Sequence, residues 1–320
     1  MPKADPKDLL ILRILDADGR ASASKIAKLT RLSKSAVSQR ISALESEGYI
    51  QGYYALIDSS RLGLQSFRVY LKYHNTSPRM ERQIMEFLSQ EPRVWWCGKM
   101  QGDWDAGLVV WARDVSEFRS FWLSFSLRFR QHIGRYVVNP YVKIRHYSLA
   151  FLCKAEGVVR QVGTVGEGPK AAIDSTDRKI LSVISEDGRC PLILIAKKTG
   201  LSPGVVKYRL VNLVRAGVIQ GYRAMINSEK LGYSLYKVNF VLNDVTKLAA
   251  IREFTEFIPN LAYIDETAGE DLEADYYLSS ELELEKLLDS YKARFHSAIR
   301  EINYLVYSHV SKQAYYPQKI

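Results

Sequence analysis

The chain repeats its own sequence once, and this duplication constrains its fold more than any other feature of the 320 residues. The stretch Asp177–Leu181 matches Asp8–Leu12, and Asp177 stands 169 positions after Asp8. At the same offset, Ile219–Tyr222 repeats the letters Ile-Gln-Gly-Tyr of Ile50–Tyr53. A register unbroken over about sixty residues cannot come from composition alone, so we predict a tandem duplication whose copies each hold one or two small domains.

Composition favours a soluble globular protein with an anionic partner. Apolar residues make up 47% of the chain, enough for several compact cores, and no apolar run is long enough for a membrane helix. The N-terminus has no apolar signal region. A net charge of +10 and a pI near 9.3 point toward a polyanion. We therefore expect a cytosolic protein that binds nucleic acid and not a membrane.

The three cysteines give no sign of a cofactor. Cys97, Cys153 and Cys190 lack the paired spacing of a zinc site or a disulfide framework. We expect reduced thiols, no metal site and no cofactor.

The charges are divided unevenly between the two copies. Residues 119–145 contain six cations and no carboxylate, whereas residues 265–289 contain ten carboxylates and Lys286 as the single cation. Two solvated faces would explain this division. The alternative is an attraction between the copies, which would favour their pairing within one chain.

Each copy begins with the pattern of a winged helix-turn-helix. Residues 6–17 predict a helix with an apolar stripe, and Ser22 can cap a short second helix. Ser33 is a natural N-cap for a third helix running to Glu45, and the β-prone stretch 49–57 predicts a β-wing. The second copy repeats this plan over residues 174–226.

The remainder of each copy predicts a ferredoxin-like domain with the order β-α-β-β-α-β. In the first copy we expect strands over 67–73, 94–97, 106–111 and 137–147, with helices beginning at Pro78 and Ser116. In the second copy we expect strands near 236–242, 262–268, 272–278 and 301–309, and helices near 247–257 and 281–297. The aromatic residues of the helices are expected to fill the cores.

These patterns predict an α+β chain with two winged helix-turn-helix domains and two ferredoxin-like domains. A glycine-rich linker separates the copies, and its start, 149–152, is expected to pack on the first sheet. The predicted ranges are 1–60 and 61–150 for the first copy, 151–172 for the linker, and 173–229 and 230–320 for the second copy.

The third helix of the first copy offers a face suited to the major groove of DNA. Val37, Ile41 and Leu44 form a narrow apolar stripe that faces the core. Short donors and acceptors on the other side can read base edges, and Gln39 can bond an adenine in two places. The predicted DNA-contacting residues are Lys34, Ser35, Ser38, Gln39, Arg40 and Ser42.

Cations around both helices are candidates for phosphate contacts. Arg40 and Arg209 recur at the common offset, although a structural salt bridge would also explain that recurrence. The other candidates are Lys25, Lys28, Arg31 and Lys34 in the first copy and Lys197, Lys198, Lys207 and Arg223 in the second.

The second copy departs from the first on its reading face. Gly204 presents no side chain, and Val205 and Tyr208 stand where the first copy has Ala36 and Gln39. We therefore predict that Lys207, Tyr208 and Arg209 contribute more to positioning than to hydrogen-bonded readout, so that the two half-sites are unequal.

These residues resemble the Lrp/AsnC (leucine-responsive regulatory protein) family of transcription regulators. The resemblance is carried by Leu-Ser at 32–33 and 201–202, by the recurring Arg40 and Arg209, and by the repeated Ile-Gln-Gly-Tyr. It covers both copies and is closest to double-length archaeal-type members. It implies a regulator that binds double-stranded DNA and whose sheet domains, called RAM domains, pair within the chain, with a homodimer as a further option.

The same resemblance implies a site for an amino acid or a similar small effector, beside a Gly-Asp-x-Asp-like turn between paired sheets. Glycine lets backbone amides approach a carboxylate, and a fixed acid can bind an ammonium group. A hairpin turn with solvated acids is the alternative. The candidates are Gly102, Asp103 and Asp105 in the first copy and Gly269, Glu270, Asp271 and Glu273 in the second.

Two other functions fit the same plan. Siroheme decarboxylases resemble this two-domain arrangement and would need histidines and cations around a tetrapyrrole with many carboxylates. Duplication alone explains the recurring histidines, and no nucleophile elbow or phosphate loop is present, so we expect no enzyme activity. The recurring histidines, at the ends of the last helix and last strand of each copy, are His132, His146, His296 and His309.

The other alternative is a non-specific architectural DNA-binding protein.

Overall fold

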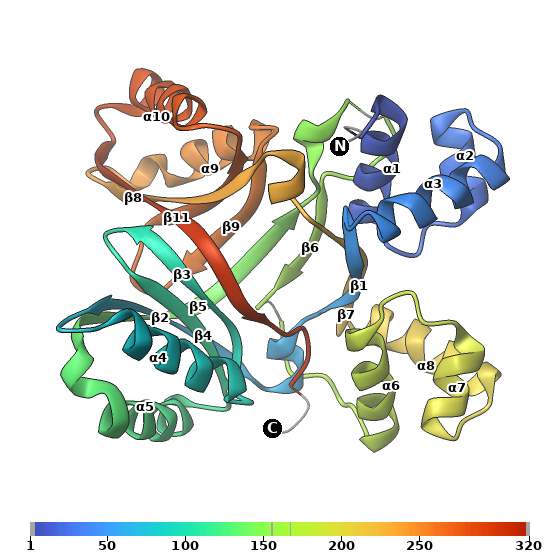
Figure 1. The fold of residues 1–320 in the computed structure, drawn as a ribbon, viewed down its shortest axis with the longest axis horizontal. Coiled ribbons are helices and arrows are strands. Elements are labelled where there is room, and N and C mark those ends of the chain that lie inside the picture. The colour runs from blue at the N-terminus through green and yellow to red at the C-terminus, as the bar shows by residue number, and fades with distance from the viewer. Residues whose placement is uncertain (1–3, 155, 167, 318–320) are drawn as a thin grey trace.

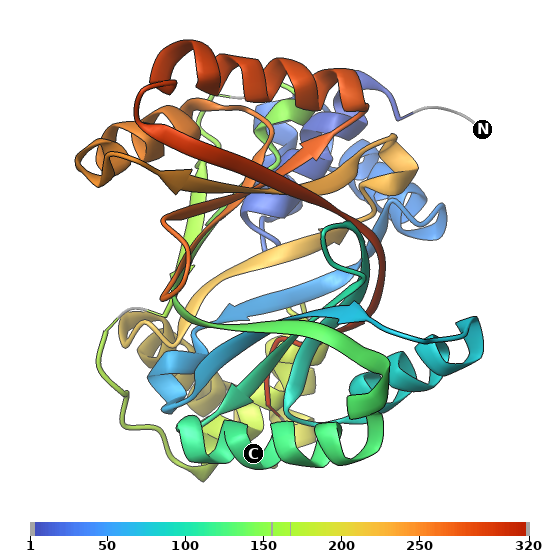
Figure 2. The ribbon, with the colours of Figure 1, turned by 90° about the vertical axis from the view of Figure 1, so that its left-hand side faces the viewer.

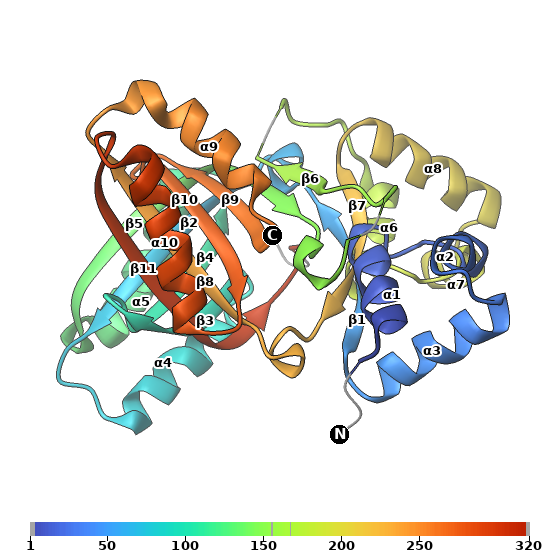
Figure 3. The ribbon, with the colours of Figure 1, turned by 90° about the horizontal axis from the view of Figure 1, so that it is seen from above.

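The computed structural model describes residues 4–154, 156–166 and 168–317 and has the expected tandem α+β fold (Figure 1). The expectation for the N-terminal segment falls partly on residues 1–3, outside these ranges. The two winged helix-turn-helix modules lie on one side of the molecule and the two ferredoxin-like units on the other (Figure 3).

The described part of the first copy contains five α-helices and five strands in the expected order, followed by a short strand in the linker. The helices are α1 (Pro6–Ala17), α2 (Ala23–Thr30), α3 (Lys34–Ser46), α4 (Pro78–Gln90) and α5 (Val115–Phe129). The strands are β1 (Ile50–Ile57), β2 (Gln65–Tyr73), β3 (Val94–Gly102), β4 (Ala106–Ala112), β5 (Ile133–Tyr147) and β6 (Gln161–Val165).

The second copy repeats this order with the last strand extended toward the C-terminus. Its helices are α6 (Ser175–Glu186), α7 (Leu192–Thr199), α8 (Pro203–Arg215), α9 (Leu248–Phe257) and α10 (Glu281–Phe295). Its strands are β7 (Ile219–Ile226), β8 (Ser234–Leu242), β9 (Leu261–Thr267), β10 (Leu272–Leu278) and β11 (Ile299–Gln313).

The two ferredoxin-like sheets close into one barrel. Within each copy the strands run in the order β3-β4-β2-β5 and β9-β10-β8-β11, all antiparallel. The sheets then join at two seams, where β3 pairs with β11 and β5 pairs with β9. The predicted pairing of the two sheet domains within the chain is therefore present, and the seams leave no free edge between them.

Side-chain alternation divides each strand between an outer apolar face and the barrel interior. Outer residues such as Val69 and Val238 pack under helices α4 and α5 on one sheet and α9 and α10 on the other (Figure 2). Inner positions next to them on the same strands carry polar groups, including Arg68 and Lys237. The interior is thus more polar than the two cores that flank it.

The predicted β-wing strand forms as β1, but its partner lies in the other copy. β1 and β7 do not fold into hairpins within their own modules; they pair with each other as an antiparallel two-stranded ribbon. Each module also packs on the other copy's strand, because the Gly19 amide donates to Tyr222 O at 2.6 Å and the Gly188 amide donates to Tyr53 O at 2.8 Å. The two winged helix-turn-helix modules therefore complete each other's cores.

The linker also differs from the prediction. Residues 161–165 form β6, which pairs with the end of β5. Leu149 and Leu152 pack in the core of the first winged helix-turn-helix module, beside Ile11 and Leu12, and not on the first sheet. The described part of the linker is therefore packed on both the barrel and the first module.

We expect Gly188→Ala to lower the free energy of unfolding by about 1–3 kcal/mol, because an added Cβ would lie 2.6 Å from the Tyr54 carbonyl carbon. Chemical denaturation would measure this loss. Gly204→Ala in α8 is the control, since a Cβ there meets no atom closer than 4.0 Å and alanine favours a helix. If both variants unfolded like the wild type, the close packing of the 187–189 turn on β1 would be refuted.

Candidate nucleic-acid interface

Helix α3 buries its apolar stripe and exposes the predicted reading face. Val37, Ile41 and Leu44 are buried in the module core. The N-cap forms as predicted, with Ser33 Oγ accepting from the Ala36 amide at 3.1 Å. Lys34, Ser35, Ser38, Gln39 and Ser42 are all exposed on the opposite side. No described part of the chain covers this row, so it is free to enter a groove.

The exposed polar groups of α3 remain available for new hydrogen bonds. Ser38 donates to the Lys34 carbonyl at 3.1 Å, and the hydroxyls of Ser33 and Ser35 lie 3.0 Å apart. Among the described residues, Gln39 has no hydrogen-bond partner, so its amide can donate and accept at the same time. This is the property required for a two-point contact with an adenine edge.

Arg40 and Arg209 make ion pairs within their own modules. Arg40 Nη1 lies 2.7 Å from Asp5 and 2.8 Å from Asp8, the two residues that cap α1. Arg209 repeats this contact with Asp174 at 2.6 Å and Asp177 at 3.3 Å. The geometry supports the structural salt bridge named above as the alternative, since both arginines tie a reading helix to the first helix of its module.

The other phosphate candidates divide into exposed and buried groups. The prediction that Arg223 contacts a phosphate is wrong: this residue of β7 is 4% exposed and binds Asp16 at 2.6 Å, so it cannot reach a phosphate. Lys25 is exposed but lies 2.8 Å from Asp18. The remaining candidates lie on the exposed surfaces of the modules: Lys28, Arg31, Lys34, Lys197, Lys198 and Lys207.

The outer face of the second module is apolar where the first is polar. Tyr208 is 65% exposed, and Val205, Val211 and Val214 lie exposed along the same helix. Ile193 of α7, 72% exposed, extends the apolar surface. The two modules therefore present different chemistry to a ligand, in the direction that the sequence predicted.

The predicted effector turns lie apart, at opposite seams of the barrel. The first turn follows β3, where Gly102 pairs with Leu305 of β11. In the second turn, the Ala268 amide donates to Pro140 O of β5. The two seams are separate, so the residues Gly102, Asp103 and Asp105 do not meet Gly269, Glu270 and Asp271.

Several acids of these turns already have structural partners. Asp105 accepts from the Tyr73 amide at 2.7 Å, and Asp271 accepts from the Leu242 amide at 2.8 Å, which are equivalent contacts in the two copies. Glu273 does not lie at the turn: it is fully buried on β10 and binds Arg68. These contacts favour the hairpin alternative for the three acids.

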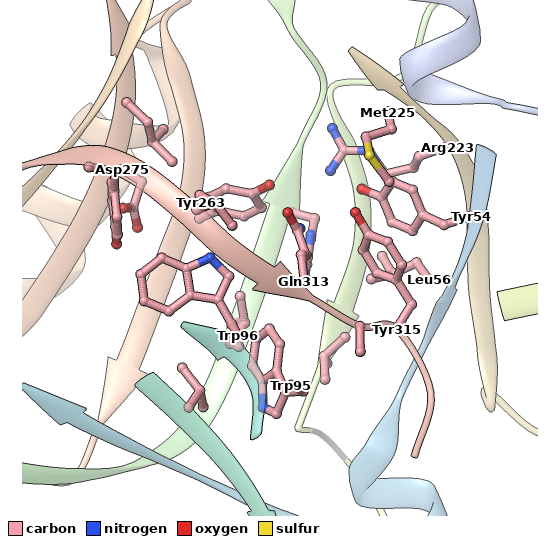
Figure 4. A pocket seen from close by; sticks show the side chains of 18 of the residues that line it. Tyr54, Leu56, Trp95, Trp96, Arg223, Met225, Tyr263, Asp275, Gln313 and Tyr315 are labelled. Carbon is pink, nitrogen blue, oxygen red and sulfur yellow. The ribbon is translucent and has the colours of Figure 1, made fainter. Parts of the chain in front are cut away.

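A cavity of about 520 Å³ lies between the barrel interior and the β1–β7 ribbon. Figure 4 shows Asp275, Trp96 and Tyr263 at one end of it, Arg223, Met225 and Tyr54 at the other, and Gln313 between them. Tyr315 closes the ribbon end by stacking on Tyr54 with ring centroids 3.8 Å apart. No local pattern marks this cavity, because its walls come from strands far apart in the sequence.

Two of the four recurring histidines lie at the cavity. His146 and His309 both line it, whereas His132 and His296 do not. No three His, Cys, Asp or Glu side chains in the described part of the chain are grouped to hold a metal ion, and the three cysteines are free. Within the described ranges, no helix is long and apolar enough to cross a membrane.

Comparison with known proteins gives two matches to a winged helix-turn-helix DNA-binding family model, at residues 5–51 and 173–220. The transcriptional regulator LrpA of Pyrococcus horikoshii is 42% identical over 81 residues, which are 25% of this chain and 57% of LrpA. The Bkd operon transcriptional regulator of Pseudomonas aeruginosa is 35% identical over 122 residues, which are 38% of this chain and 80% of the relative.

The fold as a whole is similar to that of the siroheme decarboxylase NirDL, with a TM-score of 0.64 and 15% identity. The alignment covers 97% of this chain and 93% of NirDL. At this identity the likeness is one of fold, and it shows that the complete tandem arrangement occurs in another solved protein.

We expect Arg40→Ala to lower the melting temperature, because the α1 cap residues Asp5 and Asp8 lose their cation. Burial opposes ionisation of Asp5, but the Asp8 amide and Arg40 hold its pKa below the ordinary value of 3.8. The contribution is therefore complete above pH 3.8 and is lost as the pH falls through the lowered pKa, so variant and wild type should converge in acid. Melting curves from pH 7 to pH 2.5 would test this.

Arg79→Ala is the control, because it removes an exposed arginine from α4 without touching either module. A gap between Arg40→Ala and the wild type that stayed constant down to pH 2.5 would contradict the assigned role of Asp5.

Proposed function

Because this chain belongs to the Lrp/AsnC family of transcription regulators, we propose that it binds a specific sequence of double-stranded DNA and regulates transcription in the cytoplasm. The observation that carries the proposal is the exposed polar row of α3, with Gln39 unpartnered among the described residues. A helix that buries one stripe and presents short donors and acceptors on the other side suits the major groove.

The ribbon supports this proposal by fixing the two modules relative to each other. α1 packs on β7 and α6 packs on β1, so neither reading helix can turn without disturbing the other module. Modules held in this way would read half-sites about one helical turn of DNA apart, roughly 34–36 Å. Arg40 would contribute indirectly, by holding α3 in place.

The two half-sites would be unequal. The first module offers hydroxyls and an amide, which read base edges by hydrogen bonding. The second offers Val205 and Tyr208, which suit the methyl group of thymine and the sugar-phosphate surface. The chain would therefore select an asymmetric operator, and a perfect palindrome recovered by binding-site selection would count against it.

Control by an amino acid or a similar effector at the RAM-type domains remains part of the proposal. Within the turns, Gly102, Asp103, Gly269 and Glu270 are the groups left for it, since Asp105 and Asp271 are bound to backbone amides. A second chain could contribute to such a site by forming a homodimer.

We expect Gln39→Ala to weaken binding to the selected operator about tenfold while changing binding to scrambled DNA little, because the amide reads bases. Lys34→Ala should weaken binding to both DNAs equally and reduce the salt dependence by about one phosphate contact. Fluorescence anisotropy at several salt concentrations would measure both effects.

Gln90→Ala, on the outer helix α4, is the matched control for loss of an exposed amide. Equal losses on both DNAs from Gln39→Ala would show that the α3 face does not read sequence. Binding that vanished on both DNAs at physiological salt would favour the architectural alternative.

We also propose that the chain is not a siroheme decarboxylase, although it shares the fold of one. A tetrapyrrole with many carboxylates needs uncommitted cations, but Arg68 and Arg223 in the cavity are each bound to a buried acid. Burial, and then the charge of Arg223, lower the pKa of His146 to about 3, so this histidine is neutral and supplies no charge.

Mixing the protein with siroheme should therefore give no Soret shift and no release of carbon dioxide, with NirDL as the positive control. Carbon dioxide released at a rate above that of siroheme alone would refute the non-enzymatic proposal while leaving DNA binding to be judged by its own assay.

A further inference from the structure

The barrel end of the cavity contains a buried cluster of charges that do not balance. Arg68 and Lys237 are its cations, and Asp265, Glu273 and Asp275 are its acids, each at most 4% exposed. Lys237 Nζ lies 2.6 Å from Asp265, 2.8 Å from Asp275 and 3.3 Å from Glu273, while Arg68 forms a two-point pair with Glu273. Three carboxylates therefore share two cations.

The surplus carboxylate faces the cavity. Of these five residues, Arg68, Asp265 and Asp275 line the cavity, and Lys237 and Glu273 lie behind them. Oδ2 of Asp275 binds Lys237, but its Oδ1 makes no hydrogen bond to a described residue, although the Tyr307 hydroxyl lies beside it. Burial raises the pKa of Asp275 above its ordinary range. This is the direction expected for a buried acid whose negative charge is not fully balanced by a nearby cation.

The surrounding walls are aromatic. Trp96 and Tyr307 contact each other edge to face, with ring centroids 5.4 Å apart. The rings of Tyr70 and Tyr141 already lie 4.5 and 5.3 Å from the Arg68 guanidinium, which shows that this enclosure presents ring faces to a cation. The hydroxyl of Tyr70, a residue 2% exposed, has no hydrogen-bond partner among the described residues.

The cavity is large enough for the apolar part of a small ligand, and it opens to the protein surface. Its volume of about 520 Å³ lies within the range of small-molecule sites. It extends from Asp275 to the stacked pair Tyr54 and Tyr315 (Figure 4). The exposed residues Gln51 and Glu229 belong to its lining, so it reaches the surface beside the ribbon.

We propose that this cavity binds a small organic monocation, a protonated amine with a flat apolar body, whose ammonium group lies against Asp275 and beside the contacting rings of Trp96 and Tyr307. The ammonium balances the third carboxylate, and the ring faces stabilise it by cation–π contact. The body extends toward Tyr54 and Tyr315, where flat aromatic groups can stack.

Anionic ligands fit this site less well. Arg223 at the ribbon end is held by Asp16 at 2.6 Å and donates to Tyr147 O at 3.0 Å, so its charge is already paired, although its Nη1 has no hydrogen-bond partner among the described residues. A carboxylate at the barrel end would add a fourth negative charge to the cluster. The site therefore differs in place and in charge preference from the effector turns considered above.

The test is calorimetric titration of the full chain with 2-phenylethylamine, 2-phenylethanol and phenylacetate, which share a phenyl body and differ in charge. We expect the amine to bind at least about tenfold more tightly than the alcohol and the acid. Equal binding of amine and alcohol, tighter binding of phenylacetate, or no measurable binding of the amine would each overturn the proposal.

Asp275→Asn should abolish the preference for the amine, because it leaves two acids for two cations without changing the shape of the wall. Asp289→Asn is the matched control: it removes the same charge from an exposed position on α10. Amine binding that persisted in Asp275→Asn would refute the assignment. If that variant fails to fold, Trp96→Leu can replace it; this variant removes one of the aromatic rings beside the proposed ammonium position and should weaken amine binding. The comparison of the three ligands on the wild type tests the proposal in either case.

The cavity also touches the DNA-binding side of the molecule. Tyr54 and Leu56 of β1 and Arg223 and Met225 of β7 form its ribbon wall (Figure 4). An effect of the amine on DNA affinity would rest on the proposed function, and anisotropy with and without the amine would measure it. Calorimetry requires no DNA, so a failure of DNA binding and a failure of amine binding can be told apart.

Discussion

The exchange of β1 and β7 between the two halves is the contact on which the rest of the structure depends. A two-stranded ribbon is marginal by itself, so its stability comes from the helices that pack on it. α1 packs against β7 and α6 against β1, and Ala224 and Ile57 each lie in the core of the opposite module. Neither winged helix-turn-helix module is therefore complete without the other copy. This reciprocity joins the two modules into one structural unit.

The charges inside the barrel explain why the first copy pairs with the second. Arg68 comes from the first copy, whereas Lys237 and all three acids come from the second. Two second-copy sheets facing each other would double the acids without adding Arg68, and a buried charge without a partner is costly. The strand registers place Gly98, Gly107 and Val109 of the first copy where the second copy has Asp265, Glu273 and Asp275.

Local patterns predicted the elements well because periodicity and capping are local. The α3 stripe, its Ser33 cap and the β-α-β-β-α-β order all follow from spacing within a few residues. The strand of the wing was predicted but its partner was not, because β1 pairs with β7, 169 positions later in the chain, and a strand pattern does not specify which strand it joins. The pairing of Arg40 with Asp5 and Asp8 could have been found, since Arg209, Asp174 and Asp177 repeat it at the common offset.

The buried charges were harder to predict for a physical reason. Glu273 and Asp275 alternate with apolar residues along β10, and this is also the pattern of a strand with one face in water. The sequence difference between residues 119–145 and 265–289 pointed to attraction between the copies, and the pair of Arg145 with Glu266 is an example of it across a seam. The larger effect comes from Arg68, a single cation within an apolar strand, which no charge count over a segment would single out.

Duplication within one chain also explains how the two reading faces came to differ. In a symmetric dimer, any change to the reading helix appears in both half-sites at once. Here α3 keeps Ser35, Ser38 and Gln39 exposed, while the matching side of α8 exposes Val205 and Tyr208. The ribbon and the barrel hold both helices whatever their outer side chains are, because those side chains take no part in either interface. Each module could therefore change its surface chemistry separately while the distance between the modules stayed fixed.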